Sequence, residues 1–89
     1  MAAIFAITTG VILKIDTLEW VLVTIVIGIV FLTELLNSSL EALADFVKPE
    51  HNEQIRKVKD FSAAAVLVSA LIAVIVGGLI FIPRILNFF

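Results

Sequence analysis

The feature that most constrains the fold is an apolar run from Phe61 to Ile82, which contains no charged residue over 22 positions. A helix of about 20 apolar residues crosses the roughly 30 Å hydrocarbon core of a bilayer, so this run is long enough to span a membrane. A second apolar run, from Trp20 to Leu32, continues without a helix breaker into a polar stretch. With 62% hydrophobic residues and a mean hydropathy of +1.21, the 89-residue chain exceeds what a water-soluble domain of this size can bury.

We therefore expect an all-α integral membrane protein, a helical bundle of three transmembrane helices that forms a single domain. The first apolar segment has about 13 residues and rises only about 20 Å as a helix, which is short of the hydrocarbon thickness. The first span is thus expected to be truncated, with further residues preceding Met1. Pro83 and Arg84 are expected to end the third helix. The predicted bounds are about 1–14, 17–47 and 53–82 for the helices, with a turn at 48–52 and a single domain over 1–89.

The basic residues predict the orientation of the chain in the membrane. Four of the six lie in the connection between the second and third helices: Lys48, Arg56, Lys57 and Lys59. The positive-inside rule places this connection in the cytoplasm. A net charge of -2 gives no reason to expect a nucleic acid partner, and the lack of cysteine excludes disulfides and thiol chemistry.

A polar stripe follows the second apolar run, because Glu34, Asn37, Glu41 and Asp45 recur at helical spacing and share one face. Acids near mid-membrane cost on the order of 3 kcal/mol each and are functional by default. A span from Leu18 would leave the hydrocarbon near Asn37, so the stripe lies close to the interface, where this cost is smaller. Glu34 then lies inside the boundary, whereas Glu41 reaches water. We favour a functional role for these two acids over a solvated face.

Antiparallel packing of the second and third helices would bring Lys59 and Asp60 to the depth of the stripe. This combination fits a reaction between a lipid headgroup and a water-soluble anion. Glu34 could accept a proton from a lipid hydroxyl, and Glu41 could hold Mg²⁺ with nucleotide phosphates. Lys59 could neutralise phosphate charge, and Asn37 could orient either carboxylate.

Other interpretations of these residues remain open. The chain contains no Walker glycine loop and no protein-kinase signature, so the acids need not bind a nucleotide. Lys59 could be a snorkelling anchor at the interface, and His51 is more simply a solvated turn residue. A ridge of small residues on the third helix predicts close packing with another helix; its members are Ala65, Ser69, Ala73 and Gly77.

Two motifs carry a resemblance to a known family. The stretch Glu34-x-x-Asn-x-x-x-Glu41-x-x-x-Asp45 is followed by Lys59-Asp60-x-x-x-Ala-x-Val-Leu. This double pattern resembles the small prokaryotic diacylglycerol kinase family, which includes undecaprenol kinases, from about Trp20 to the end of the chain. The resemblance implies a lipid kinase of three spans that works as a homotrimer with composite sites between subunits. It also implies the bacterial cytoplasmic membrane, with the active site on the cytoplasmic side.

The resemblance assigns roles by position. Glu34 corresponds to the catalytic base, Asn37 to a catalytic amide, and Glu41 to the carboxylate that binds Mg²⁺ and ATP. Lys59 and Asp60 correspond to an ATP-contacting pair. The resemblance implies a weaker nucleotide contact for three residues of the turn, Glu50, His51 and Asn52. This assignment is weaker because the family histidine most often lies one place later than His51.

One departure from the family pattern concerns the N-terminus, where a surface helix with an arginine and a second metal-binding glutamate are expected but absent. We predict ATP-dependent phosphorylation of a membrane lipid alcohol, diacylglycerol or undecaprenol, which the missing segment would impair. The alternatives are a catalytically inactive or structural membrane subunit and, less favoured, an ion-handling membrane ring. Rotor rings carry their acid near mid-membrane in glycine-rich hairpins, whereas this chain has four glycines and acids at one interface.

Overall fold

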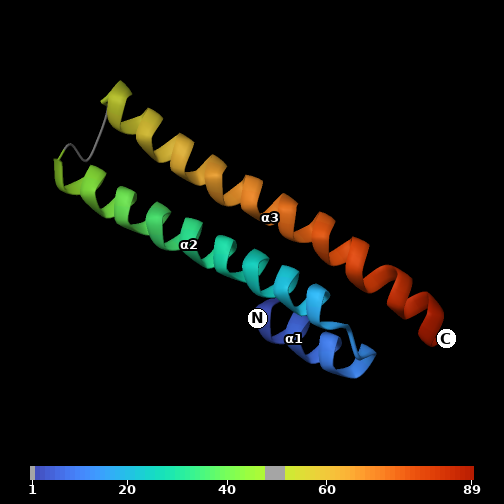
Figure 1. Ribbon diagram of the computed structural model, residues 1–89. Coiled ribbons are helices and arrows are strands. Elements are labelled where there is room, and N and C mark those ends of the chain that lie inside the picture. Colours follow the sequence, from blue (N-terminus) through green and yellow to red (C-terminus); the bar gives the residue numbers. More distant parts are fainter. Residues whose placement is uncertain (1, 48–51) are drawn as a thin grey trace.

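The computed structural model describes residues 2–47 and 52–89, which form three α-helices and no strand (Figure 1). This arrangement confirms the all-α class. The helix bounds agree closely with the expected ones at the first two helices, and most of the expected turn at 48–52 lies outside the described residues. The helices are α1 (Ala2–Leu13), α2 (Thr17–Val47) and α3 (Glu53–Phe88).

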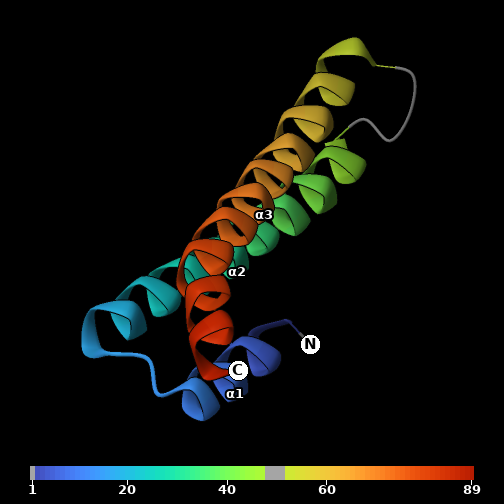
Figure 2. The ribbon, with the colours of Figure 1, turned by 90° about the vertical axis from the view of Figure 1, so that its right-hand side faces the viewer.

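The two long helices run antiparallel, side by side, and give the molecule an elongated shape of 54 × 19 × 15 Å (Figures 1 and 2). α1 folds back from the α1–α2 turn and packs mainly against the C-terminal part of α3. The end at which α2 finishes and α3 begins therefore lies far from α1.

The surface of the long helices suits a lipid environment. Both α2 and α3 are long and apolar enough to cross a membrane, whereas the 12 residues of α1 are fewer than a span requires. Only 6% of the most apolar window of α2 and 11% of that of α3 are buried within the molecule. A core helix of a soluble protein would bury most of these side chains, so the structure is that of an all-α membrane bundle.

The contact between α2 and α3 combines a small apolar core with polar contacts. Val23 of α2 and Ile80 of α3 form the core with Ile15 of the α1–α2 turn, and Trp20 packs against it. Farther along the helices, the hydroxyls of Thr33 and Ser69 lie 2.9 Å apart in a hydrogen bond between α2 and α3.

The small-residue ridge of α3 meets α2 at Ser69, which hydrogen-bonds to Thr33. Ser69 is 2% exposed, and Ala73 and Gly77 are half-buried, whereas Ala65 is exposed. The predicted close packing is therefore confirmed at Ser69, whereas a Cβ atom at Gly77 would have only Phe81 of the same helix within 4 Å.

A tight turn reverses the chain between α1 and α2. Lys14 adopts a left-handed conformation with φ of 55°. The Ile15 N–H donates to the Gly10 carbonyl (3.2 Å) and the Lys14 N–H to the Val11 carbonyl (3.3 Å). This pair of bonds is a Schellman motif, which satisfies carbonyls that the end of α1 would leave unpaired.

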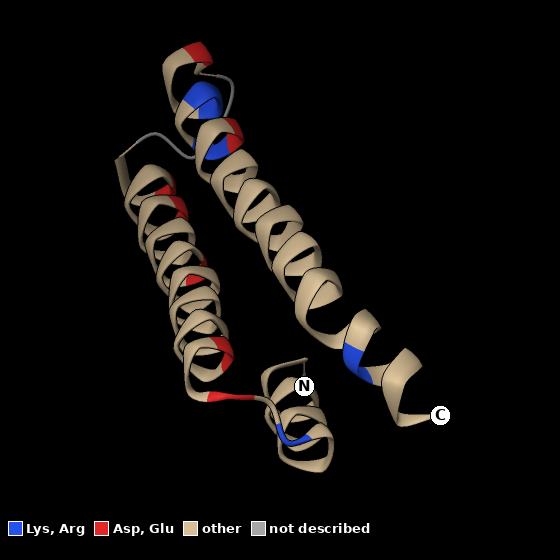
Figure 3. Ribbon diagram, turned by 45° about the vertical axis from the view of Figure 1, so that its right-hand side comes forward, with Lys and Arg blue, Asp and Glu red and all other residues tan. Residues whose placement is uncertain are grey.

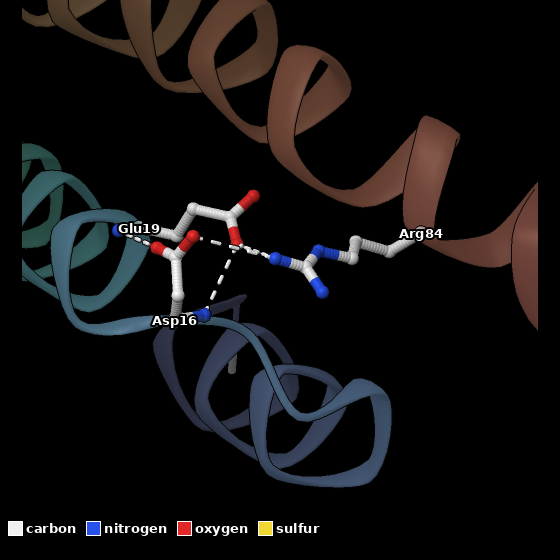
Figure 4. Close-up of polar contacts among 3 residues, drawn as sticks. All are labelled: Asp16, Glu19 and Arg84. Atoms are coloured by element: carbon white, nitrogen blue, oxygen red, sulfur yellow. Dashed lines mark hydrogen bonds and ion pairs between the residues drawn. The ribbon is translucent and has the colours of Figure 1, made fainter.

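The start of α2 is tied to the end of α3 by three charged side chains (Figure 4). Asp16 Oδ1 accepts a hydrogen bond from the Glu19 N–H (2.9 Å), and Glu19 Oε1 accepts one from the Asp16 N–H (3.1 Å). This capping box satisfies two donors at the helix start. The Arg84 guanidinium forms ion pairs with both carboxylates, so one side chain of α3 holds the first turn of α2.

The end of α3 corrects one prediction. α3 continues through Pro83 to Phe88, so the expectation that Pro83 and Arg84 end the helix at residue 82 is wrong. Proline removes the hydrogen bond to the carbonyl four residues earlier but is compatible with a membrane helix whose neighbours support it. We attribute the continuation to Arg84, since its pairing with Asp16 and Glu19 favours the helical path directly after the proline.

Gly10 allows the close packing of α1 on the turn and on α2. A Cβ atom at this position would lie 2.9 Å from the indole ring of Trp20 and 3.1 Å from Ile15 Cδ1. We expect Gly10→Ala to displace α1 and to destabilise the fold by about 1–3 kcal/mol, as overpacking does. Fluorescence of Trp20, the single tryptophan, reports the displacement directly, and a thermal melt in detergent reports the stability.

Gly28→Ala is the matched control, because a Cβ atom at Gly28 would have nothing within 4 Å. It should leave the Trp20 emission unchanged and stability equal or slightly higher. Equal melting temperatures and emission for Gly10→Ala and the unmodified chain would contradict the close packing.

Candidate functional site

Most charged residues of the paired helices α2 and α3 lie toward the two ends of the pair (Figure 3). Figure 3 shows acids along the last turns of α2 beside the mixed charges of the first turns of α3. We call this region the charged end, and it includes the side chains predicted to act on a nucleotide. Between Phe61 and Pro83, α3 carries no charge.

The acids of the α2 stripe border the contact with α3 and do not lie inside it. Glu34, Glu41 and Asp45 are exposed, whereas Asn37 is half-buried and Ala44 is buried. Within the described residues, Glu34 has no hydrogen-bond or ion-pair partner. Its carboxylate therefore faces outward from α2, two turns, or about 10 Å, before Glu41.

Asn37 connects the two helices at the site. Its Oδ1 accepts a 2.7 Å hydrogen bond from the Ser62 hydroxyl of α3, and its Nδ2 lies 3.5 Å from Glu41 Oε1. The amide thus links a buried hydroxyl of one helix to an exposed carboxylate of the other. Sequence reasoning predicted that Asn37 orients a carboxylate, and the structure brings it to Glu41.

Lys59 pairs with Asp45 across the charged end, through a hydrogen-bonded ion pair. Lys59 precedes the apolar run of α3, so it lies outside the segment expected to cross the membrane. The hydrogen bond to Asp45 raises the pKa of the Lys59 ammonium above its usual value, against a smaller opposing effect of desolvation. The negative charges of Asp45 and Glu41 also raise this pKa, so Lys59 lies in the field of both acids.

The remaining predicted residues are placed differently. Asp60 is exposed on the first turns of α3. Asn52 caps α3, since its side-chain oxygen accepts hydrogen bonds from the backbone N–H groups of Gln54 (3.0 Å) and Ile55 (3.1 Å). Glu50 and His51 lie outside the described residues.

Two contacts of the site were missed by sequence reasoning. Ser62 was not singled out, although its spacing of three residues from Lys59 places both on one side of α3. Asp45 was assigned no partner. The correct register between α2 and α3 would have identified both contacts, but this register cannot be derived from the sequence pattern alone.

The carboxylates at the charged end could supply only part of the ligand shell of a magnesium ion. No group of three or more histidine or acidic side chains that could hold a metal occurs within residues 2–47 and 52–89. Mg²⁺ in nucleotide sites commonly takes one or two carboxylates, with phosphates and water completing its shell. Glu41 can supply one such carboxylate, so the donor chemistry fits an ion that arrives with a nucleotide.

A cavity of about 310 Å³ lies at the opposite end of the molecule, where Arg84, Pro83 and Phe88 of α3 meet Glu19 and Leu13. It does not coincide with the charged end.

Comparison with known proteins assigns the family. The family model described as prokaryotic diacylglycerol kinase matches residues 1–81. This chain belongs to the prokaryotic diacylglycerol kinase family. The predicted resemblance to a family of lipid kinases is thereby confirmed.

Individual relatives are about one third identical to this chain over the aligned residues. An undecaprenol kinase of Bacillus subtilis is 35% identical over 83 residues, 93% of this chain and 68% of the relative. A diacylglycerol kinase of Escherichia coli K12 is 33% identical over 75 residues, 84% of this chain and 62% of the relative. A diacylglycerol kinase of Synechocystis is 33% identical over 82 residues, 91% of this chain and 47% of the relative. No solved structure gave a significant match.

The ion pair at the charged end can be tested by reversing its charges. Lys59→Asp places a third acid beside Asp45 and Glu41, so we expect a lower melting temperature at low salt. Adding Asp45→Lys to that variant should recover most of the loss, because the pair is restored in the opposite sense. Thermal melts in detergent, repeated at high salt to screen the charges, measure both effects.

Lys57→Asp is the control, since Lys57 is exposed and two residues before Lys59, on a different side of α3. A double variant that melts no higher than Lys59→Asp alone would show that the ion pair does not stabilise the charged end.

Proposed function

We propose that this protein transfers the γ-phosphoryl group of ATP to the hydroxyl of a membrane lipid, diacylglycerol or undecaprenol, at the cytoplasmic face of the membrane. The observation that carries the proposal is the order of the acidic residues along α2, from the apolar part of the helix to the charged end. Glu34 lies exposed toward the apolar part of the helix, and Glu41 lies two turns nearer the charged end, where Lys59 and Asp45 meet. A lipid hydroxyl and a nucleotide can therefore approach the same helix face from opposite directions.

Glu34 is proposed to act as the general base. Its carboxylate accepts the proton of the lipid hydroxyl as the hydroxyl oxygen forms a bond to the γ-phosphorus. The bond between the γ-phosphorus and the bridging oxygen breaks, and ADP leaves with that oxygen. The phosphorylated lipid and ADP account for all atoms, with the proton retained on Glu34 until water removes it.

The charged end is proposed to hold the nucleotide. Glu41 would bind Mg²⁺, which neutralises phosphate charge when it is present. The Lys59 ammonium, directed by Asp45, contributes a second positive charge, and Asp60 completes the ATP-contacting pair. Asn37 holds the Glu41 carboxylate from the side of the helix contact. Glu50, His51 and Asn52 are proposed as weaker nucleotide contacts.

The orientation follows from the basic residues at the charged end. The positive-inside rule favours the cytoplasmic side for this end, where ATP is available. The membrane is then the bacterial cytoplasmic membrane, consistent with the bacterial sources of the relatives.

A homotrimer is proposed as the working assembly. Glu34 is exposed on the apolar part of α2, where contact with lipid tails is costly for a carboxylate. A second copy of the chain packed beside α2 would cover this acid and complete the site from another subunit.

Glu34→Gln tests the base directly. The amide cannot accept the proton, so turnover should fall by about 10²- to 10⁴-fold while the melting temperature stays unchanged. Transfer of radiolabel from the γ-position of ATP to extracted lipid measures the activity. Glu53→Gln is the matched control, because Glu53 pairs with Arg56 at the start of α3, away from the α2 stripe.

An active Glu34→Gln variant would overturn the assignment of the base. Absence of transfer by folded protein, with either diacylglycerol or undecaprenol, would reject the kinase and favour a structural membrane subunit. A panel containing both lipids also identifies the substrate.

A further inference from the structure

We propose that Ser62 is a positioning residue, whose hydroxyl sets the orientation of the Asn37 amide and thereby presents its N–H₂ group to Glu41. This inference rests on the proposed function, in which Glu41 is the nucleotide and metal carboxylate. It assigns a role in the site to a residue of the neighbouring helix that lies outside the acidic stripe.

The geometry fixes the direction of each hydrogen bond. An ionised carboxylate only accepts, so Glu41 requires the Nδ2 group of Asn37 to face it, as observed at 3.5 Å. The Asn37 Oδ1 is then turned toward α3, and an amide oxygen also only accepts. Ser62 supplies the matching donor at 2.7 Å. The chain of donors therefore runs from Ser62 through Asn37 to Glu41.

The Ser62 hydroxyl has one proton and a competing acceptor. Its Oγ lies 3.0 Å from the carbonyl of Lys59, in the previous turn of α3, and 2.7 Å from Asn37 Oδ1. The shorter distance favours donation to Asn37. Ser62 is 7% exposed, so water has little access to replace it if the hydroxyl is removed.

Loss of the hydroxyl would release the amide. Asn37 Oδ1 would lose its donor at a half-buried position, and no contact with α3 would then hold the amide in one orientation. The Nδ2 group would face Glu41 for only part of the time, so the Glu41 carboxylate would be held less firmly where it can bind a nucleotide-borne metal ion. Groups that orient a metal ligand in this way typically change metal affinity by about 10- to 100-fold.

Ser69 provides a matched comparison on the same helix. It lies seven residues, or two turns, farther along α3, is 2% exposed, and also hydrogen-bonds across the contact, to Thr33 at 2.9 Å. Its partner is a hydroxyl whose oxygen also lies 3.0 Å from the Val30 carbonyl of its own helix. This connection does not reach an acid, so Ser69 holds the helices together without orienting a site residue.

The experiment compares Ser62→Ala with Ser69→Ala in the full chain in detergent micelles. Binding of Mn²⁺ together with a non-hydrolysable ATP analogue is followed by electron paramagnetic resonance. We expect Ser62→Ala to weaken Mn²⁺ binding about tenfold and Ser69→Ala to leave it unchanged, although both lower the melting temperature. Ser62→Thr retains the hydroxyl and should restore binding.

Selective ¹⁵N labelling of asparagine gives a second readout that does not depend on nucleotide. The chain has three asparagines, Asn37, Asn52 and Asn87, so their side-chain amide signals can be distinguished. Ser62→Ala should shift and broaden the Asn37 pair, whereas Ser69→Ala should not. If Ser62→Ala fails to fold, Ser62→Cys preserves the volume with a weaker donor and should show an intermediate effect.

The outcomes separate this inference from the proposed function. Equal Mn²⁺ binding and equal Asn37 signals in the two alanine variants would overturn the positioning role, even if the unmodified protein phosphorylates lipid. Weakened binding and a shifted Asn37 signal in Ser62→Ala alone would support it, even if no phosphate transfer is detected and the kinase proposal fails.

Discussion

Two apolar helices gain little from burying each other in a bilayer, because lipid tails are as apolar as leucine side chains. The register of α2 against α3 therefore depends on contacts that lipid cannot replace. Three such contacts are distributed along the pair: the hydrogen bond between the hydroxyls of Thr33 and Ser69, the hydrogen bond between Asn37 and Ser62, and the ion pair of Lys59 with Asp45. Each joins one helix to the other, so a shift of either helix along the other would break them together.

The opposite end of the pair is held by charge. Arg84 binds both carboxylates of the capping box that starts α2, and the small apolar core lies beside it. The chain is thus fixed at both ends, with α1 packed against the end that carries Arg84. Because these two attachments lie far apart on a narrow molecule, the angle and the register of the helices are set together.

Much of the architecture could be predicted from the sequence. Run lengths and helix breakers gave the bounds of α2, and helical spacing placed Glu34, Asn37 and Glu41 on one side of it. The end of α3 could not be predicted, because Pro83 signals termination locally, whereas α3 continues to Phe88 and Arg84 pairs with carboxylates that are distant in the sequence. The contacts of Ser62 and Lys59 depend on how α2 and α3 align, and many alignments of two apolar helices satisfy the same hydropathy pattern.

The position of the acids beside the helix contact has a consequence for how such a chain can change over time. Glu34 and Glu41 are exposed, so replacing them removes little that holds the fold together. Mutations at these two acids could therefore remove the proposed activity while the fold is kept. Asn37 is different, since it contacts Ser62 across the helices and Glu41 along its own helix. If the proposed site is correct, selection for a stable fold and selection for activity act on the same side chain at that position.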